Sequence, residues 1–263
     1  MSAGSGLTTK LRIVSLAPSA TSILCEIGAR GNLVGVTKWC ADVAPVTSWP
    51  KLGDCWHLNS AEELVALRPT LVIGSVPFKT ETVATLLEQP FAFLAMNPRS
   101  LADIDADVRL LAGITGRRGS GERLIRKMQS AFHACAPKRQ SKNARKLRVY
   151  SEAWPNPRIS SPLWVSELIA LCGAESVVKP GQRVTDEDVA AAEPDVILLA
   201  WAATGEKGKP QKAYEVPAWK DVPAIRNRQV HVVRDELLNT PGPPLMEGAR
   251  ALARIFRDAE RAL

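Results

Sequence analysis

Short apolar runs alternate along this chain with stretches in which apolar residues recur every three or four positions. The runs 11–16, 33–37 and 70–75 are continuous enough to predict buried strands. Between the first two runs, Ala17-Pro18-Ser19 supplies a break and a cap for a helix that ends at Gly28. Strands that alternate with helices favour a parallel sheet covered on both faces, so the pattern predicts an α/β fold.

An internal repeat is the most informative pattern. Residues 60–75 align with residues 185–200, and each stretch contains a hydroxyl cap, an acidic first turn, a proline and an apolar strand. Pro69 and Pro194 each end a short helix before the strand begins, because proline disfavours helix at the residue before it. A weaker repeat aligns 12–15 with 148–151. The repeats predict two Rossmann-like lobes of similar construction.

A strong helical stripe of apolar residues lies between the two halves. Leu124, Met128 and Phe132 belong to a predicted helix from about Arg117 to about Lys142. Such a helix would be about 40 Å long at 1.5 Å per residue, and we expect this single long α-helix to join the lobes as a rigid strut. The predicted organisation is an amino-terminal α/β lobe over 1–115, the connecting helix over 116–143 and a carboxyl-terminal α/β lobe over 144–263.

Length and composition exclude several classes of protein. With 263 residues, 46% of them hydrophobic and 23% charged, the chain can bury a real core and is neither disordered nor a coiled coil. Its longest apolar run, 196–201, is far shorter than the roughly 20 residues of a membrane-spanning helix. The five cysteines are an odd number without C-x-x-C spacing, which favours reduced thiols over a disulfide framework or a structural zinc site.

The net charge of +7 comes from one segment. Residues 117–148 contain eleven basic side chains and one acidic side chain, without the interleaved aromatic residues of a surface that binds single-stranded nucleic acid. We interpret the segment as a solvated helix face rather than a nucleic-acid site, with a contact to an acidic protein or to lipid headgroups as the alternative.

The first ten residues lack the apolar stretch of a secretory signal. This predicts a cytoplasmic protein, or an extracytoplasmic one if a signal peptide was removed.

Catalytic motifs are scarce. The glycine-rich run 116–121 lacks the spacing of a phosphate-binding loop, and no Gly-x-Ser-x-Gly elbow accompanies the three histidines. The prediction is therefore a protein that is not an enzyme and has no catalytic cofactor. Cys40, Cys55 and His57 are weak candidates for a soft-metal site or for an axial ligand to a metal macrocycle.

Tryptophan is unusually frequent, with seven residues against two tyrosines and five phenylalanines. Four of them stand beside the ends of predicted strands: Trp39, Trp56, Trp154 and Trp201. The carboxyl ends of parallel strands form the ligand crevice of open α/β sheets, and aromatic rings there offer flat contact area to a large planar ligand. We therefore predict a binding cleft between the lobes, whereas Trp49 and Trp219 are interpreted as packing residues.

Several segments together resemble a known family. Residues 12–21, 33–36, 64–73 and 167–174 are similar to the cobalamin (corrinoid) and iron-siderophore substrate-binding proteins of ABC importers, and the likeness extends over about 11–256. The resemblance implies two α/β lobes joined by one long helix, with the ligand between them.

The cobalamin branch is the closer likeness. It implies corrinoid contacts at Trp39 and Trp56, and docking of Glu62 and Glu187 onto arginines of a permease.

Departures from the cobalamin pattern bear on the ligand. Ser75 stands where that branch can carry a stacking tryptophan, the loop 179–183 lacks an aromatic residue, and an expected arginine is missing near 243–244. The stretches 152–157 and 161–164 instead resemble a subgroup of cobalamin-binding-like proteins.

The resulting hypothesis is a monomeric binding protein that closes on a corrinoid, for an ABC importer or for handling inside the cell. The predicted ligand contacts are Trp39, Trp56, Glu152, Trp154, Asn156, Arg158 and Trp201. One alternative is a siderophore or haem binder, for whose anionic chelate Lys38, Arg158 and Arg183 are the basic candidates. The other is an enzyme that acts on a cofactor precursor in the same cleft through Cys40, Cys55 or His57.

Overall fold

The computed structural model describes residues 10–137, 145–202 and 209–262, which fall into two units. Unit 1 comprises the chain up to Asn97 together with Arg109–Gly121, and unit 2 comprises Pro98–Val108 and Glu122–Leu263. Each unit contains its own sheet, so the prediction of an α/β fold with two similarly built halves is confirmed.

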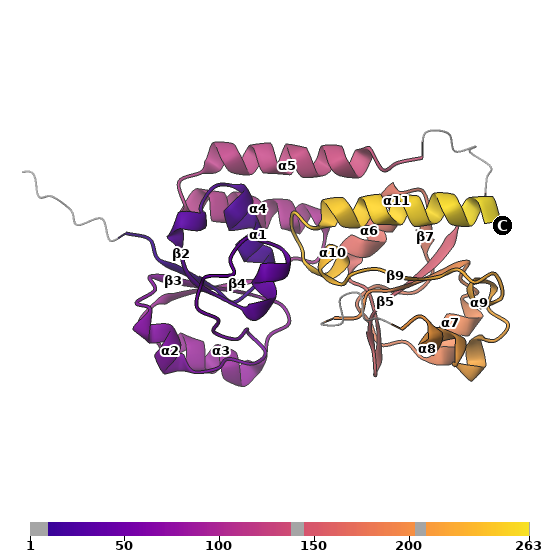
Figure 1. Cartoon of the computed structure of the whole chain (residues 1–263), viewed down its shortest axis with the longest axis horizontal. Coiled ribbons are helices and arrows are strands. Elements are labelled where there is room, and N and C mark those ends of the chain that lie inside the picture. The colour runs from indigo at the N-terminus through magenta and orange to yellow at the C-terminus, as the bar shows by residue number, and fades with distance from the viewer. Residues whose placement is uncertain (1–9, 138–144, 203–208, 263) are drawn as a thin grey trace, which may run out of the picture. The chain divides into compact units, whose positions relative to one another are not determined.

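Unit 1 is built on a fully parallel sheet in the order β2-β1-β3-β4. Helices α2 and α3 lie on one side of this sheet and α1 on the other (Figure 1). The strands are β1 (Ile13–Ser15), β2 (Leu33–Val36), β3 (Leu71–Ser75) and β4 (Ala92–Met96), and the helices are α1 (Pro18–Glu26), η1 (Arg30–Asn32), η2 (Lys38–Asp42), α2 (Ala61–Ala66) and α3 (Thr80–Leu87). The three strands predicted in this half are therefore all present.

Unit 2 has a sheet in the order β6-β5-β8-β9, with β7 paired to β5. All its pairs are parallel except β5 with β6, which form an antiparallel hairpin that the sequence pattern did not indicate. The strands are β5 (Arg148–Pro155), β6 (Arg158–Ser160), β7 (Glu175–Ser176), β8 (Val196–Leu199) and β9 (Val230–Val232). The helices are α6 (Leu163–Leu171), α7 (Asp186–Ala191), α8 (Gln211–Tyr214), η4 (Pro217–Trp219), α9 (Pro223–Arg226), α10 (Glu236–Asn239) and α11 (Leu245–Ala262).

Helices α4 (Leu101–Ile114) and α5 (Arg118–His133) each contain residues of both units. The helix predicted to reach Lys142 ends at His133, so its length is about 24 Å rather than about 40 Å. Pro137 explains the early end, because it disfavours helical backbone at the preceding residue and lacks an amide hydrogen. The predicted continuation over 138–142 lies outside the described residues.

The internal repeat is confirmed as a repeated helix-strand module, α2-β3 in unit 1 and α7-β8 in unit 2. Each helix begins after a hydroxyl cap, Ser60 or Thr185, whose side chain accepts a hydrogen bond from the backbone three residues later. Each module also has a left-handed residue immediately before its proline, Arg68 with φ 47° and Glu193 with φ 39°. The repeat thus preserves the backbone turn as well as the hydrophobic pattern.

An arginine at the start of the first strand secures each module. Arg12 donates to the carbonyl of Leu67 at the end of α2 (2.6 Å), and Arg148 donates to the carbonyl of Ala192 at the end of α7 (2.8 Å). Leu67 and Ala192 are equivalent positions of the repeat. Each arginine therefore satisfies a helix-end carbonyl that has no partner within the helix.

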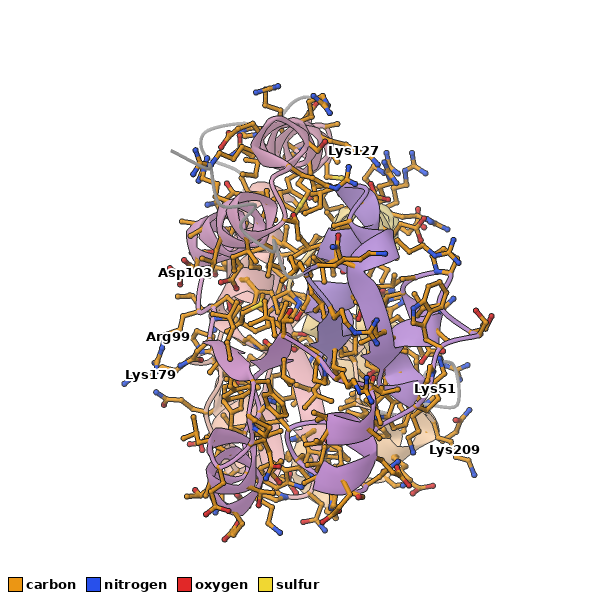
Figure 2. All side chains as sticks on the ribbon, turned by 90° about the vertical axis from the view of Figure 1, so that its left-hand side faces the viewer. Lys51, Arg99, Asp103, Lys127, Lys179 and Lys209 are labelled. Carbon is orange, nitrogen blue, oxygen red and sulfur yellow. The ribbon has the colours of Figure 1, made fainter. Side chains whose placement is uncertain are left out.

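Apolar side chains fill each unit separately. Val14, Leu64 and Val72 belong to one buried cluster in unit 1, and Ile197 and Trp219 belong to another in unit 2. Charged side chains such as Arg99 and Lys179 extend away from the ribbon (Figure 2). Among the described residues, no helix combines the length and the apolar character needed to cross a membrane.

Candidate functional site

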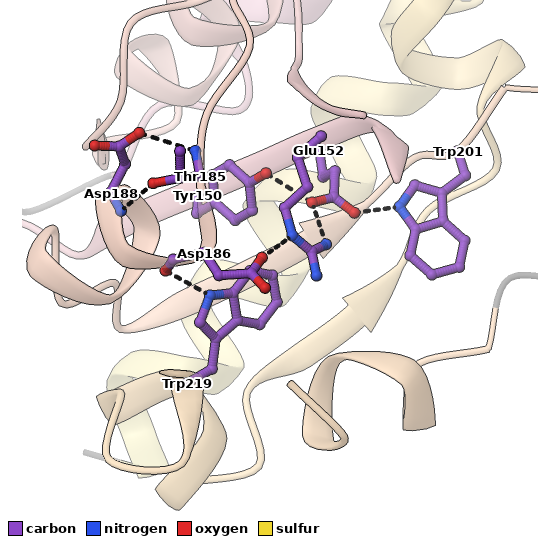
Figure 3. A network of polar contacts seen from close by, with 8 residues as sticks. Tyr150, Glu152, Thr185, Asp186, Asp188, Trp201 and Trp219 are labelled. Atoms are coloured by element: carbon purple, nitrogen blue, oxygen red, sulfur yellow. Dashed lines mark hydrogen bonds and ion pairs between the residues drawn. The ribbon is translucent and has the colours of Figure 1, made fainter. Parts of the chain in front are cut away.

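A buried carboxylate organises the carboxyl end of β5. Glu152 has no exposed surface, and Tyr150 and Trp201 point toward its carboxylate (Figure 3). The Tyr150 hydroxyl donates to Oε2 at 2.7 Å, and the Trp201 indole nitrogen donates to Oε1 at 2.7 Å. Because burial and the neighbouring Glu152 carboxylate both disfavour a phenolate, the pKa of Tyr150 is raised and its hydroxyl stays a donor.

Arg158 completes the network from the paired strand β6. Its Nη1 donates to Glu152 Oε2 at 2.9 Å and its Nε donates to Asp186 Oδ1. The guanidinium also lies over the ring of Trp219, 4.3 Å from its centroid. Burial disfavours the charged form of Arg158, but the hydrogen bonds to the two carboxylates outweigh it and raise the pKa.

Local structure brings these groups together from five segments, namely β5, β6, the start of α7, η4 and the residues after β8. The β5-β6 hairpin, which turns at Asn156 and Pro157, returns Arg158 beside Glu152. Asp186 opens α7, whose capping box between Thr185 and Asp188 fixes the start of the helix. Trp219 ends η4 and donates its indole hydrogen to the Asp186 carbonyl at 3.0 Å, while Trp201 follows β8.

Glu152 is enclosed by its own partners. Its carboxylate is fully buried and accepts hydrogen bonds from three side chains, so a ligand could reach it only by displacing one of these donors, and the direct ligand contact stays a prediction. In this structure Glu152 fixes the orientation of Arg158 and Trp201. Arg158 keeps 17% of its side chain exposed and Trp201 keeps 6% exposed, while Lys212 Nζ lies 5.8 Å from the centre of the Trp201 ring.

Trp154 and Asn156 lie on the hairpin at the surface. The predicted strand through Tyr150 continues to Pro155, so Trp154 belongs to β5 and not to a loop after it. Its side chain is 42% exposed, and its indole nitrogen donates to the Asn156 carbonyl at 2.8 Å. The hydrogen bond anchors one edge of the indole and leaves a large part of the ring accessible.

In unit 1 the most exposed tryptophan is Trp56, at 48%. The backbone amides of Trp56 and His57 both donate to Asp54 Oδ1, at 2.9 and 2.8 Å, which fixes the turn that presents Trp56. Gly53 adopts φ +81°, and a side chain there would meet the His57 carbonyl at 2.2 Å. Only glycine fits this close approach without distortion.

Trp39 lies in η2 and is half-buried. Lys38 Nζ is 4.4 Å from the centre of its ring, within the range of a cation–π contact. Lys38, one of the basic residues predicted to contact an anionic ligand, is therefore exposed beside an aromatic face. Arg183, another of these residues, is also exposed, and its backbone forms an isolated antiparallel β-bridge with Ile159.

The thiols do not form a reactive or metal-binding group with His57. Cys40 is buried beside Thr21 and Thr37, Cys55 is buried behind Gly74, and His57 is exposed. Burial raises the pKa of both thiols, to about 12 for Cys55, so both are protonated at neutral pH. Among the described residues, no three His, Cys, Asp or Glu side chains gather where they could hold a metal ion.

Glu62 and Glu187 occupy the second position of the equivalent helices α2 and α7, and both are exposed. A 2.6 Å hydrogen bond from the Ser60 hydroxyl lowers the pKa of Glu62, so this carboxylate stays ionised. The repeat therefore presents an exposed carboxylate at this position in each unit.

Sequence reasoning missed Tyr150 and Asp186 as members of the site. Asp186 was visible only as part of an acidic helix start, and Tyr150 as part of an apolar strand. Trp219 is fully buried, which confirms its interpretation as a packing residue. Its stacking on Arg158 links three segments that the sequence pattern treats separately.

Comparisons with known proteins support the family resemblance. The family model described as periplasmic binding protein matches residues 13–237. The vitamin B12-binding protein of Pectobacterium carotovorum subsp. carotovorum (strain PC1) is 26% identical over 252 residues, covering 92% of this chain and 86% of its own length. The uncharacterized ABC transporter substrate-binding lipoprotein YvrC of Bacillus subtilis is 25% identical over 254 residues, covering 92% of this chain and 78% of its own.

A solved structure shows the same fold. The periplasmic heme-binding protein RhuT from Roseiflexus sp. RS-1, in its apo form, superposes with a TM-score of 0.78 at 26% identity, covering 97% of this chain and 100% of that chain.

Proposed function

The chain belongs to the periplasmic binding protein family, and on that premise we propose that it captures a cobalamin-like corrinoid. It would act as the substrate-binding protein of an ABC-type importer or handle the ligand inside the cell. The likeness to a vitamin B12-binding protein over most of both chains supports the choice of ligand class.

The observation that carries the proposal is an exposed tryptophan in each unit. Trp56 and Trp154 are among the most exposed large apolar side chains of the described residues, and each is held by a defined turn or hairpin. Tryptophan is enriched at binding surfaces because its indole combines a large apolar face with a polar N–H group. A corrinoid ring offers the broad apolar face that such indoles bind.

The polar part of the proposed site is preorganised. Glu152 holds Arg158 and Trp201 in place, so both would meet a ligand with little loss of side-chain freedom. Asn156 is exposed on the same hairpin as Trp154 and would add hydrogen bonds. We propose the half-buried Trp39 as a further stacking residue.

Haem is the second candidate ligand. The haem-binding protein RhuT is as similar in sequence as the B12-binding relative, and its structure covers nearly the whole chain. Haem carries two propionates, for which the exposed Lys38 and Arg183 and the partly exposed Arg158 are basic partners.

One titration separates the two ligands. Tryptophan fluorescence is followed while cobalamin, cobinamide, haem and a ferric siderophore are added in parallel. We expect saturable quenching by the corrinoids, about tenfold weaker affinity in Trp56→Ala and Trp154→Ala, and unchanged affinity in the control Trp49→Phe. Tight binding of haem alone would replace the corrinoid by the second candidate. Absence of binding by all four ligands would overturn the proposed ligand class.

We also propose that Glu62 and Glu187 dock onto a permease. Both side chains are exposed and occupy equivalent positions of α2 and α7, which supports a permease that contacts each unit through the same kind of residue. In a reconstituted importer, Glu62→Lys and Glu187→Lys are expected to abolish uptake without changing ligand affinity, whereas Glu88→Lys, at the residue that caps the end of α3, has no effect. Unchanged uptake in the double variant would exclude the docking role.

A further inference from the structure

Arg158 has donors that its two carboxylate partners leave unused. Its Nη1 donates to Glu152 and its Nε donates to Asp186, and Figure 3 shows both carboxylates facing the guanidinium. Within the described part of the chain, no hydrogen bond involves Nη2, and 17% of the side chain is exposed. A guanidinium carries more N–H groups than these two bonds use, so Arg158 can still donate to a ligand.

Asp186 offers an acceptor next to these donors. Its side chain is 39% exposed, and among the described residues only Arg158 donates to its carboxylate, at Oδ1. Nε and Nη2 lie on the same edge of the planar guanidinium, the edge with which arginine often binds a carboxylate through two parallel bonds. Here only the Nε bond is formed, so Arg158 Nη2 and Asp186 Oδ2 are a neighbouring donor and acceptor that do not bond to each other.

Negative charge exceeds positive charge around Arg158. Two carboxylates, those of Glu152 and Asp186, pair with this one guanidinium. Glu187 and Asp188 follow on α7 and are exposed. A ligand carboxylate bound at Nη2 would therefore lie beside the Asp186 carboxylate, and the two like charges would repel each other. An uncharged group that both accepts and donates avoids this repulsion.

We propose that Arg158 and Asp186 together bind a primary carboxamide of the ligand and discriminate against a carboxylate in the same place. The amide oxygen accepts from Arg158 Nη2, and the amide nitrogen donates to Asp186 Oδ2. This inference rests on the proposed function and narrows it. The pair selects a corrinoid, whose side chains end in primary amides, over haem, whose side chains end in propionates. Asp186 is then a residue that determines ligand specificity.

Both side chains are held in place without a ligand. The Trp219 ring lies 4.3 Å from the Arg158 guanidinium, and its indole nitrogen donates to the Asp186 carbonyl at 3.0 Å. The Val184 amide donates to the Arg158 carbonyl at 3.2 Å, so the backbone before α7 is also tied to β6. Asp186 cannot turn away from a ligand carboxylate without losing its bond to Arg158. The arrangement therefore favours the amide at little cost in side-chain freedom.

The experiment compares two ligands that share one macrocycle. Cobinamide carries primary amides, and cobyrinic acid carries carboxylates in their place. Binding of each to the full-length chain is measured at neutral pH by quenching of tryptophan fluorescence. We expect the wild-type protein to bind cobinamide about 100-fold more tightly, because a site that hydrogen-bonds an N–H group disfavours an analogue without it.

Asp186→Asn tests the role of the charge. Asparagine has nearly the same shape as aspartate but places an N–H donor where the Oδ2 acceptor stood. The variant should bind cobinamide more weakly and cobyrinic acid more tightly, so that the preference for the amide falls at least about tenfold. The matched control is Asp221→Asn, at an exposed aspartate of unit 2 whose ion pair is with the adjacent Lys220, and it should keep the wild-type preference.

The change in preference separates recognition from structural support. If Asp186→Asn weakened both ligands by the same factor, Asp186 would only support the fold, and the inference would be overturned. Equal affinity of the wild-type protein for the two ligands would also overturn it, while the proposed function would stand. If neither ligand bound, the proposed function would fail and the inference with it.

Discussion

Units 1 and 2 share a helix-strand module but bury different polar groups at the carboxyl end of their first strand. In unit 1, the hydroxyls of Ser15 and Thr21 lie 2.8 Å apart, and Thr21 Oγ1 is 3.1 Å from the Cys40 thiol. These groups are neutral and fully buried or nearly so. In unit 2, the corresponding region contains the carboxylate of Glu152 and the guanidinium of Arg158.

The difference shows that one backbone module supports two kinds of interior. Burying a neutral hydroxyl or thiol costs much less free energy than burying a charge, provided that the group is hydrogen-bonded. In unit 1 these groups hydrogen-bond to one another. A buried carboxylate is tolerated only while all its donors are present, so the network in unit 2 depends on residues from distant segments. Unit 2 is therefore the more sensitive to single substitutions, and it is the unit in which charge is organised at the candidate site.

The largest expected effect is that of Glu152→Ala. The change leaves Arg158, the Tyr150 hydroxyl and the Trp201 indole without their shared acceptor, so the free energy of unfolding should fall by about 3–5 kcal/mol. Urea unfolding followed by Trp fluorescence measures the loss. Hydrogen exchange should show faster opening in β5 and α7 but not in β1. Opening spread equally over both units would contradict the separation of the two interiors.

Thr21→Val tests the neutral cluster in unit 1. Valine keeps the shape of threonine and removes one hydroxyl, so we expect the free energy of unfolding to fall by about 1–2 kcal/mol. The matched control Thr85→Val removes a hydroxyl that bonds only its own helix, at the Glu81 carbonyl, and should cost less. If Thr21→Val lowered the free energy of unfolding as much as Glu152→Ala, the neutral cluster would be as sensitive to the loss of one hydrogen-bond partner as the charged cluster.

Asp107 in α4 gives unit 2 a pH dependence. Burial, with the neighbouring Asp103, raises its pKa to about 6, and its Oδ2 has no hydrogen-bond partner. Because this pKa lies above the ordinary value of about 4, the folded protein binds more protons between pH 4 and 6, and stability falls as pH rises through that interval.

Asp107→Asn should remove the loss of stability between pH 4 and 6, because asparagine does not ionise. It should raise the free energy of unfolding at pH 7 by about 1 kcal/mol, a value reduced for solvent screening of a half-exposed group, and leave pH 4 nearly unchanged. Urea unfolding at the two pH values measures the difference. Equal effects at both pH values would show that Asp107 does not titrate in this interval.

The smallest expected effect concerns the two arginines that the units share. Arg12→Met and Arg148→Met each remove a hydrogen bond to a helix-end carbonyl at a partly exposed site, so each should cost about 0.5–1 kcal/mol. Thermal unfolding of the two variants side by side measures them. A cost in one unit only would show that the modules are equivalent in geometry but not in energy.

The parts of the fold that depend on residues close together in the sequence could be predicted. The strands 11–16, 33–37 and 70–75 and the two modules of the repeat follow from apolar runs, caps and prolines within short windows. The predicted end of α5 was wrong. The basic residues after Pro137 have a composition compatible with a helix, but Pro137 prevents the helix from continuing into them. The β5-β6 hairpin was missed because its turn at Asn156 and Pro157 interrupts the apolar pattern.

The candidate site was predictable only in part. Tryptophans beside strand ends drew attention to the segments described above as the candidate site, but their sequence contexts did not distinguish the exposed Trp56 and Trp154 from the nearly buried Trp201. Glu152 was predicted as a polar ligand contact, and nothing in its local sequence indicated that it is buried. Its burial results from donors supplied by β6 and by the segment after β8.

The sequence by itself determined the α/β frame, the repeated module and its capped helix starts, because these features depend on side chains within a few positions of one another. Only the tertiary structure decided which groups share the Glu152 carboxylate, because its donors Arg158 and Trp201 come from β6 and from the segment after β8. The physical reason is the separation of these residues along the chain. Residues 49 positions apart, such as Glu152 and Trp201, become partners only when separate strands and loops pack into one unit.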